Sequence, residues 1–120
     1  MNKTILLLED EPALIALYKI WFTRYGFNVK HYICPSQAIR DNGFDGADIV
    51  ISDHQMLDET SFDLLQYMKD NNIKLPFISQ SGYENVESEA KQNGLIDLIT
   101  EFVPKPVDLK HLTEVVYKYI

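Results

Sequence analysis

The segment Asp48-Ile49-Val50-Ile51-Ser52-Asp53 points most directly to the architecture of this chain. Its three consecutive β-branched residues, Ile49–Ile51, favour a strand that is covered on both faces. The run stops at Asp53, and a polar segment, 54–60, follows it. In open α/β sheets, ligands bind beyond the carboxyl ends of the strands. A carboxylate at this position therefore suggests chemistry rather than stability.

Strand and helix signals alternate along the rest of the chain. The predicted strands are 5–8, 27–32, 48–53, 76–81 and a last one around 102–103. The predicted helices are 12–25, 35–42, 61–71, 85–93 and 109–119. Ser36 is the expected N-cap of the second helix, and Asp108 is the expected N-cap of the last. This order predicts an α/β fold, a flavodoxin-like (βα)5 open parallel sheet with helices on both faces. The flavodoxin-like strand order is 2-1-3-4-5. At 120 residues, we expect one domain spanning 1–120.

Composition excludes several classes of function. The net charge of −7 argues against direct nucleic-acid binding, which needs a basic face. A single cysteine, Cys34, rules out an internal disulfide and favours a reducing compartment. The N-terminus runs directly into four apolar residues, 5–8, which are too few for a signal peptide or membrane span. We expect a cytoplasmic protein or module without membrane insertion.

Five polar side chains follow the predicted strands at their carboxyl ends. Glu9 and Asp10 follow the first strand, Asp53 ends the third, and Ser81 and Lys105 lie at or beyond the ends of the last two. Strands 1 and 3 are neighbours at the topological switch point of this fold, so the carboxylates are expected to meet there. Clustered carboxylates repel one another, and their hard oxygen atoms suit Mg²⁺.

This set of residues favours phosphoryl chemistry. An aspartate such as Asp53 can accept a phosphoryl group as an acyl phosphate. Lys105 is a compact cation for the phosphoryl oxygens, and Ser81 offers a hydroxyl donor. No glycine-rich loop follows the first or third strand, which argues against a nucleotide site.

The chain resembles the response-regulator receiver domains, the phosphoacceptor modules of two-component signalling. The matching motifs are Leu8-Glu9-Asp10-Glu11-Pro12, Asp48 to Asp53, Ser81-Gly82-Tyr83 and Phe102-Val103-Pro104-Lys105-Pro106. The resemblance covers the whole chain, and each motif ends the correct strand.

The resemblance implies a role for each matching residue. Asp53 is the phosphorylated aspartate and binds Mg²⁺ together with Asp10. Glu9 acts through the hydration shell of the metal, and the backbone carbonyl of Gln55 completes the metal site. Lys105 contacts the phosphoryl group.

The resemblance also implies a switch and its partners. Ser81 moves onto the phosphoryl group, and Phe102 turns inward with it. The Lys105-Pro106 bond is expected to be cis. A histidine kinase or histidine phosphotransfer protein donates the phosphoryl group, and the face of the fourth helix, last strand and last helix relays the signal to an output domain or target protein. The helix 85–93 has a thin apolar face, which suits an element that shifts.

Three departures from the family pattern stand out. The first acidic position holds Glu9 in place of the usual aspartate. The usual Met-Pro-x-x-Asp/Asn-Gly loop is replaced by one in which Leu57 follows Met56 and Thr60-Ser61 take the last two places. A longer connection, including 95–99, precedes Lys105. That segment is apolar enough to contact a partner, although burial against the sheet is the simpler interpretation.

Two further side chains lie beside the predicted site. His54 follows Asp53, and because neighbours on a strand point to opposite faces, we expect a packed or solvent-facing histidine and no catalytic role. Tyr83 is expected near the mouth of the site, where it either screens the phosphoryl group from water or covers the loop.

Two alternative functions stay open. An aspartyl-phosphate hydrolase of the haloacid dehalogenase type would carry a second aspartate two residues after the nucleophile, where this chain has Gln55. A receiver that docks without phosphorylation is compatible with the altered 57–61 loop, but the presence of Asp10, Asp53 and Lys105 argues against it. Apart from acting on itself, the chain is therefore not expected to be an enzyme.

Overall fold

A computed structural model describes residues 2–82 and 85–120, so the expectation for Tyr83 falls outside the described residues. Five parallel strands form one sheet in the order β2-β1-β3-β6-β7. They are β1 (Thr4–Leu8), β2 (Asn28–Tyr32), β3 (Ile49–Asp53), β6 (Phe77–Ser81) and β7 (Glu101–Pro104). This order confirms the predicted flavodoxin-like topology, because β6 and β7 are the fourth and fifth strands of the parallel sheet.

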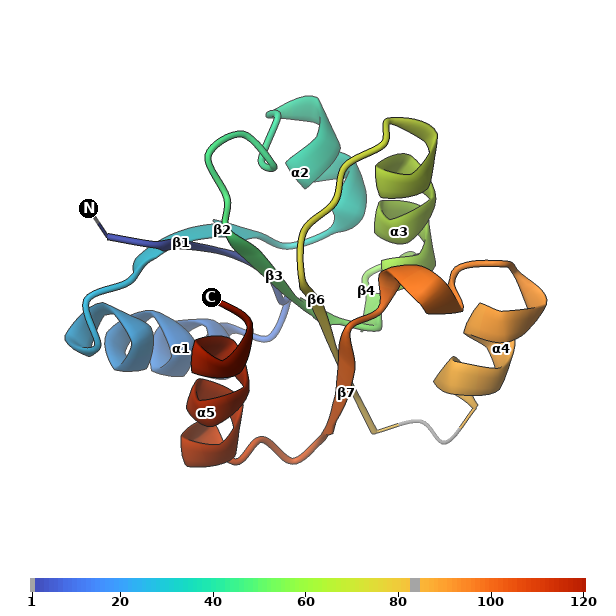
Figure 1. The fold of residues 1–120 in the computed structure, drawn as a ribbon. Coiled ribbons are helices and arrows are strands. Elements are labelled where there is room, and N and C mark those ends of the chain that lie inside the picture. The colour runs from blue at the N-terminus through green and yellow to red at the C-terminus, as the bar shows by residue number, and fades with distance from the viewer. Residues whose placement is uncertain (1, 83–84) are drawn as a thin grey trace.

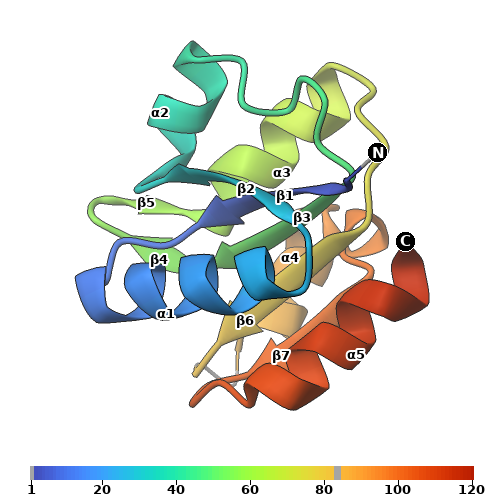
Figure 2. The same ribbon diagram turned by 90° about the vertical axis from the view of Figure 1, so that its left-hand side faces the viewer.

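Helices cover both faces of the sheet, as the alternating pattern predicted (Figure 1). They are α1 (Pro12–Arg24), α2 (Pro35–Arg40), α3 (Ser61–Asp70), α4 (Val86–Gln92) and α5 (Leu109–Tyr119). Figure 2 shows α1 and α5 on one side of the strands and α2 and α3 on the other. The strand order reverses at β1, with β2 on one side and β3, β6 and β7 on the other, so crossovers of the usual right hand place helices on both faces.

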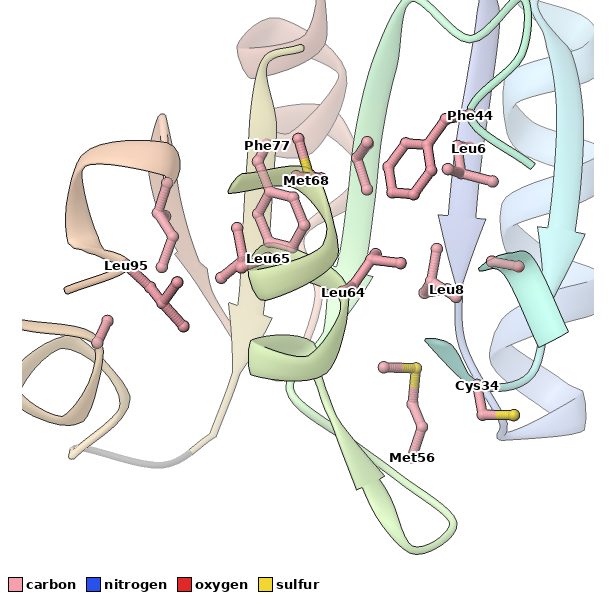
Figure 3. Packing of buried hydrophobic residues seen from close by; sticks show 14 residues of the cluster. Leu6, Leu8, Cys34, Phe44, Met56, Leu64, Leu65, Met68, Phe77 and Leu95 are labelled. Atoms are coloured by element: carbon pink, nitrogen blue, oxygen red, sulfur yellow. The ribbon is translucent and has the colours of Figure 1, made fainter. Parts of the chain in front are cut away.

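Two apolar cores hold the layers together. Figure 3 shows the first, in which Leu64, Leu65 and Met68 of α3 pack toward Leu6 of β1 and Phe77 of β6. All five side chains are at most 1% exposed. Burying a side chain of this size contributes about 1.5–3 kcal/mol.

The second core lies under α1 and α5. Tyr18 and Phe22 of α1 pack with Ile51 of β3, and Leu112 and Val116 of α5 join them. The two cores pack against opposite faces of the sheet and so fix the positions of the strand ends.

Most helix ends agree with the sequence signals. Pro12 opens α1, and Gly26 follows it with a φ of 87°, a left-handed value that glycine tolerates. Asp108 caps α5 by accepting the His111 backbone N–H. The prediction for α2 was wrong, because its N-cap is Cys34 and Ser36 lies inside the helix. With Pro35 at the first helical position, the N-cap lies two residues before the predicted one.

Two short elements interrupt the alternation. Residues 54–60, predicted as a polar loop, contain the hairpin of β4 (Gln55–Met56) and β5 (Glu59–Thr60). A 3-10 helix, η1 (Ile96–Leu98), follows α4. Leu95 and Ile99 on either side of it are 2% and 9% exposed, and Ile96 and Leu98 are half-buried against the first core, so the apolar side chains of this segment pack inward while Asp97 stays exposed.

Candidate functional site

Asp53 is the last residue of β3, at the carboxyl edge of the sheet. The sheet register places it beside Gln80 of β6. Its Oδ1 accepts the backbone N–H of His54 at 2.8 Å, and its Oδ2 lies 3.2 Å from the Lys105 amine. The side chain is 15% exposed, so the carboxylate is held in place and still reachable from solvent.

Lys105 bridges two carboxylates. Its Nζ lies 3.2 Å from Glu9 Oε2 as well as 3.2 Å from Asp53 Oδ2. Burial acts to lower the pKa of Lys105, but the charges of Asp53 and Glu9 outweigh burial and raise the pKa above its ordinary value. The lysine therefore keeps its charge at the centre of the acidic cluster.

Glu9 is a buried carboxylate, 1% exposed. Its Oε1 accepts the Glu11 backbone N–H at 3.2 Å. Burial raises the pKa of Glu9, against the opposing effects of the Glu11 hydrogen bond and the Lys105 charge, and the nearby Asp53 charge adds to the rise. A buried carboxylate in this position favours a cation beside it.

Asp10 completes the cluster. Glu9, Asp10 and Asp53 each offer an oxygen atom, and these atoms lie within 4.8 Å of one another. Hard oxygen ligands at a partly open strand edge fit Mg²⁺, which takes one or two carboxylates and retains water. The structure thus brings together the three carboxylates that the sequence predicted at one edge.

Gln55 lies in β4, two residues beyond Asp53, and pairs with Thr60 across the hairpin. The hairpin reaches the acidic cluster through its tip, where the Leu57 backbone N–H donates to Asp10 Oδ2 at 3.1 Å. The hairpin thus contacts the cluster directly. The sequence carried no signal for this contact, because the loop lacks a hairpin motif such as Asn-Gly.

Ser81 is the last residue of β6, and Phe102 lies within the neighbouring strand β7, opposite Ser79. Both line a cavity of about 190 Å³, together with Ser79 and Val86. The Ser79 hydroxyl is buried and has no hydrogen-bond partner among the described residues. The Ser81 carbonyl accepts the Lys105 backbone N–H at 3.2 Å, and the Lys105-Pro106 bond is cis, as expected.

Sequence reasoning missed a buried polar pair near the cluster. The Tyr18 hydroxyl donates to Gln80 Oε1 at 3.1 Å, and both side chains are fully buried. Burial raises the pKa of Tyr18 above its ordinary value, and the Glu9 and Asp53 charges act in the same direction. No sequence pattern links positions 62 residues apart.

His54 and His31 lie near the acidic cluster and form hydrogen bonds with neighbouring residues. His54 is 7% exposed, hydrogen-bonds Ser61 Oγ through Nδ1 at 2.8 Å and packs edge-on against Phe62, so of the two expected placements, packed or solvent-facing, the structure shows the packed one. Burial lowers the pKa of His54. His31 Nε2 hydrogen-bonds the Glu9 carbonyl at 2.9 Å, which orders the backbone behind the acidic cluster.

Comparison with known proteins identifies the family. The sequence profile of the response regulator receiver domain matches residues 5–117. The DNA-binding transcriptional regulator NtrC of Rhizobium meliloti is 28% identical over 115 residues, which are 94% of this chain and 23% of that protein.

Two solved structures illustrate the shared fold. The response regulator receiver domain (CheY-like) from Methylobacillus flagellatus has a TM-score of 0.82 and 20% identity, with 100% of both chains covered. The response regulator TrrA from Thermotoga maritima, in complex with Mg²⁺-BeF, has a TM-score of 0.81 and 20% identity over 98% of this chain and 99% of that one.

The chain therefore belongs to the response regulator receiver domain family and is a signalling module of two-component systems. Receiver domains bind Mg²⁺ at an acidic pocket, and this chain has such a cluster in Glu9, Asp10 and Asp53. The chain spans 23% of the length of its NtrC relative. Across residues 2–82 and 85–120, no helix combines the length and apolar character that crossing a membrane requires.

Proposed function

We propose that this receiver domain is a Mg²⁺-dependent switch that accepts a phosphoryl group on Asp53. The observation that carries the proposal is the placement of the Lys105 amine, 3.2 Å from Asp53 Oδ2, beside three carboxylates that share one site. The donor is a histidine kinase or a histidine phosphotransfer protein.

In the proposed reaction, a carboxylate oxygen of Asp53 attacks phosphorus. The new O–P bond forms as the N–P bond of the donor phosphohistidine breaks, and the imidazole leaves. Lys105 holds the phosphoryl oxygens through its charged amine. Mg²⁺, when bound by Asp10 and Asp53 with Glu9 and the Gln55 carbonyl in support, supplies charge neutralisation.

We propose Ser81 and Phe102 as the residues that transmit the change. Both line the same cavity beside α4, and α4 has only two buried apolar side chains, Val86 and Ala90. A hydroxyl drawn toward the phosphoryl group leaves space that the half-buried Phe102 ring can fill. The face formed by α4, β7 and α5 would carry this change to an output domain or target protein.

A phosphoryl mimic tests the switch. The TrrA neighbour was solved with Mg²⁺-BeF, and the same reagent is added here while amide and aromatic signals are followed by NMR. We expect large shifts at Ser81 and Phe102 in the parent and none in Asp53→Ala. Binding of the mimic without any change at these two residues would contradict the switch while leaving phosphoryl acceptance standing.

Cytoplasmic residence is part of the proposal. The one cysteine, Cys34, is free and buried. A reducing compartment is the ordinary setting for such a thiol.

A further inference from the structure

The β4–β5 hairpin does not hold its shape through its own turn residues. Its two-residue loop is Leu57-Asp58, and Leu57 has a φ of 53°. That left-handed value is unfavourable for a residue with a Cβ atom, and two-residue hairpins favour glycine or asparagine where φ is positive. Contacts from outside the loop must therefore hold this conformation.

Two of those contacts are at the start and tip of the hairpin. The Met56 side chain is fully buried in the first core, where Figure 3 shows it on the side of the core that also holds Leu8 and Cys34. The Leu57 N–H donates to Asp10 Oδ2 at 3.1 Å. The side chain of Leu57 itself is 58% exposed, so the backbone rather than the side chain fixes the tip.

The third contact is the strongest by geometry. Glu59 Oε1 accepts the Ser36 backbone N–H at 2.7 Å, and Glu59 Oε2 accepts the Ser36 hydroxyl at 2.6 Å. We call this pair the Glu59–Ser36 clasp. Short hydrogen bonds to an ionised carboxylate are roughly twice as strong as neutral ones. The Ser36 hydroxyl lowers the pKa of Glu59 against the opposing effect of burial, so the carboxylate is ionised at neutral pH.

We propose that the Glu59–Ser36 clasp positions the hairpin for metal binding, which makes Glu59 a positioning residue of the site. The hairpin carries the Gln55 carbonyl and the Leu57 amide that contacts Asp10. The inference rests on the proposed function, because the metal ligands are those assigned there. The clasp takes the place of the proline and glycine that this loop lacks.

Reciprocity follows from the proposal. If the clasp favours the metal-bound site, the metal must favour the clasp by the same free energy. Mg²⁺ binding should therefore stabilise the Glu59–Ser36 clasp at the start of α2, a helix outside the α4–β7–α5 face.

Mg²⁺ titration of the full chain, followed by ¹H–¹⁵N NMR, tests the proposal. We expect Glu59→Ala to weaken Mg²⁺ binding about fivefold or more, the lower end for coupled sites. Ser36→Ala keeps one of the two hydrogen bonds and should fall between parent and Glu59→Ala. Asp58→Ala is the matched control, since it removes the same charge one residue away without touching the clasp.

A second variant separates positioning from charge. Leu57→Gly relieves the unfavourable φ, so adding it to Glu59→Ala should recover part of the lost affinity. Hydrogen exchange of the Ser36 amide gives an independent measurement. Exchange should slow when Mg²⁺ is added to the parent and should not respond in Glu59→Ala.

The outcomes are distinct. Equal losses of affinity in Asp58→Ala and Glu59→Ala would reduce the effect to net charge and overturn the proposal. Mg²⁺ binding that leaves Ser36 exchange unchanged in the parent would overturn it as well. Failure of the parent to bind Mg²⁺ would overturn the metal site of the proposed function together with this inference.

Discussion

The amine of Lys105 forms an ion pair with the buried carboxylate of Glu9 at 3.2 Å. The same amine contacts Asp53 at 3.2 Å, so one cation serves two carboxylates before any phosphoryl group arrives. A phosphoryl group on Asp53 adds negative charge on one side of the lysine. We expect the Lys105 amine to turn toward the phosphoryl group and to give up its ion pair with Glu9. Glu9 would then interact with the bound Mg²⁺ through its water.

Glu9→Gln should make the metal-free protein more stable at pH 7, by on the order of 1 kcal/mol. Glutamine keeps the shape of Glu9 and one of its two acceptor oxygens, enough for the Glu11 backbone N–H, and it removes a buried charge that has two acidic neighbours. Urea unfolding in the presence of a chelator measures the difference. A less stable variant would mean that the Lys105 pair outweighs the cost of burying the carboxylate.

Mg²⁺ should stabilise the parent protein against unfolding. A ligand that binds only the folded state at a concentration 100 times its Kd contributes about 2.7 kcal/mol. Asp10→Asn should lose most of this gain, because it removes a proposed metal ligand. Thermal unfolding with and without Mg²⁺ measures the gain, and Asp58→Asn should retain it.

Glu59 should make stability fall at acid pH. Its folded-state pKa lies below the ordinary value of 4.5, mainly because of the Ser36 hydroxyl. The group therefore stabilises the fold above pH 4.5 and loses that contribution as pH falls through the lowered value. Glu59→Gln should lose less stability than the parent over this window, as measured by urea unfolding at stepped pH. Parallel curves for the two proteins would contradict the role of this carboxylate.

Gly43→Ala should destabilise the fold by about 1–3 kcal/mol, the usual cost of overpacking. A Cβ atom there would lie 2.6 Å from Tyr32 Cε2 and 3.2 Å from the Ala38 carbonyl oxygen. Gly82→Ala is the control, because its added Cβ meets nothing within 4 Å among the described residues. Chemical unfolding compares the two, and equal stabilities would show that Tyr32 moves aside freely.

The clustering of Glu9, Asp10, Asp53 and Lys105 was predictable from the sequence. Each of these residues follows an apolar run, and parallel strands bring their carboxyl ends to one edge of the sheet. Strand order then made β1 and β3 neighbours. These predictions depend on topology, which strand and helix periodicity specifies well.

Details that depend on three-dimensional packing were not predictable. The sequence of α1 is apolar on several sides, so helical spacing alone does not identify its buried face. The structure leaves Leu17 and Tyr25 41% and 48% exposed and buries Phe22. The hairpin at 55–60 was missed because its contacts run to Asp10 and Ser36, which are distant in the sequence.

The central claim is that Asp53 accepts the phosphoryl group, and intact-protein mass after incubation with acetyl phosphate tests it most directly. The parent with Mg²⁺ should gain the mass of one phosphoryl group, and both Asp53→Asn and the parent with a chelator should gain none. Beryllofluoride binding to the parent serves as the control for an acyl phosphate that hydrolyses before detection. Labelling of Asp53→Asn to the same extent as the parent would contradict the claim, as would a parent that neither gains mass nor binds beryllofluoride.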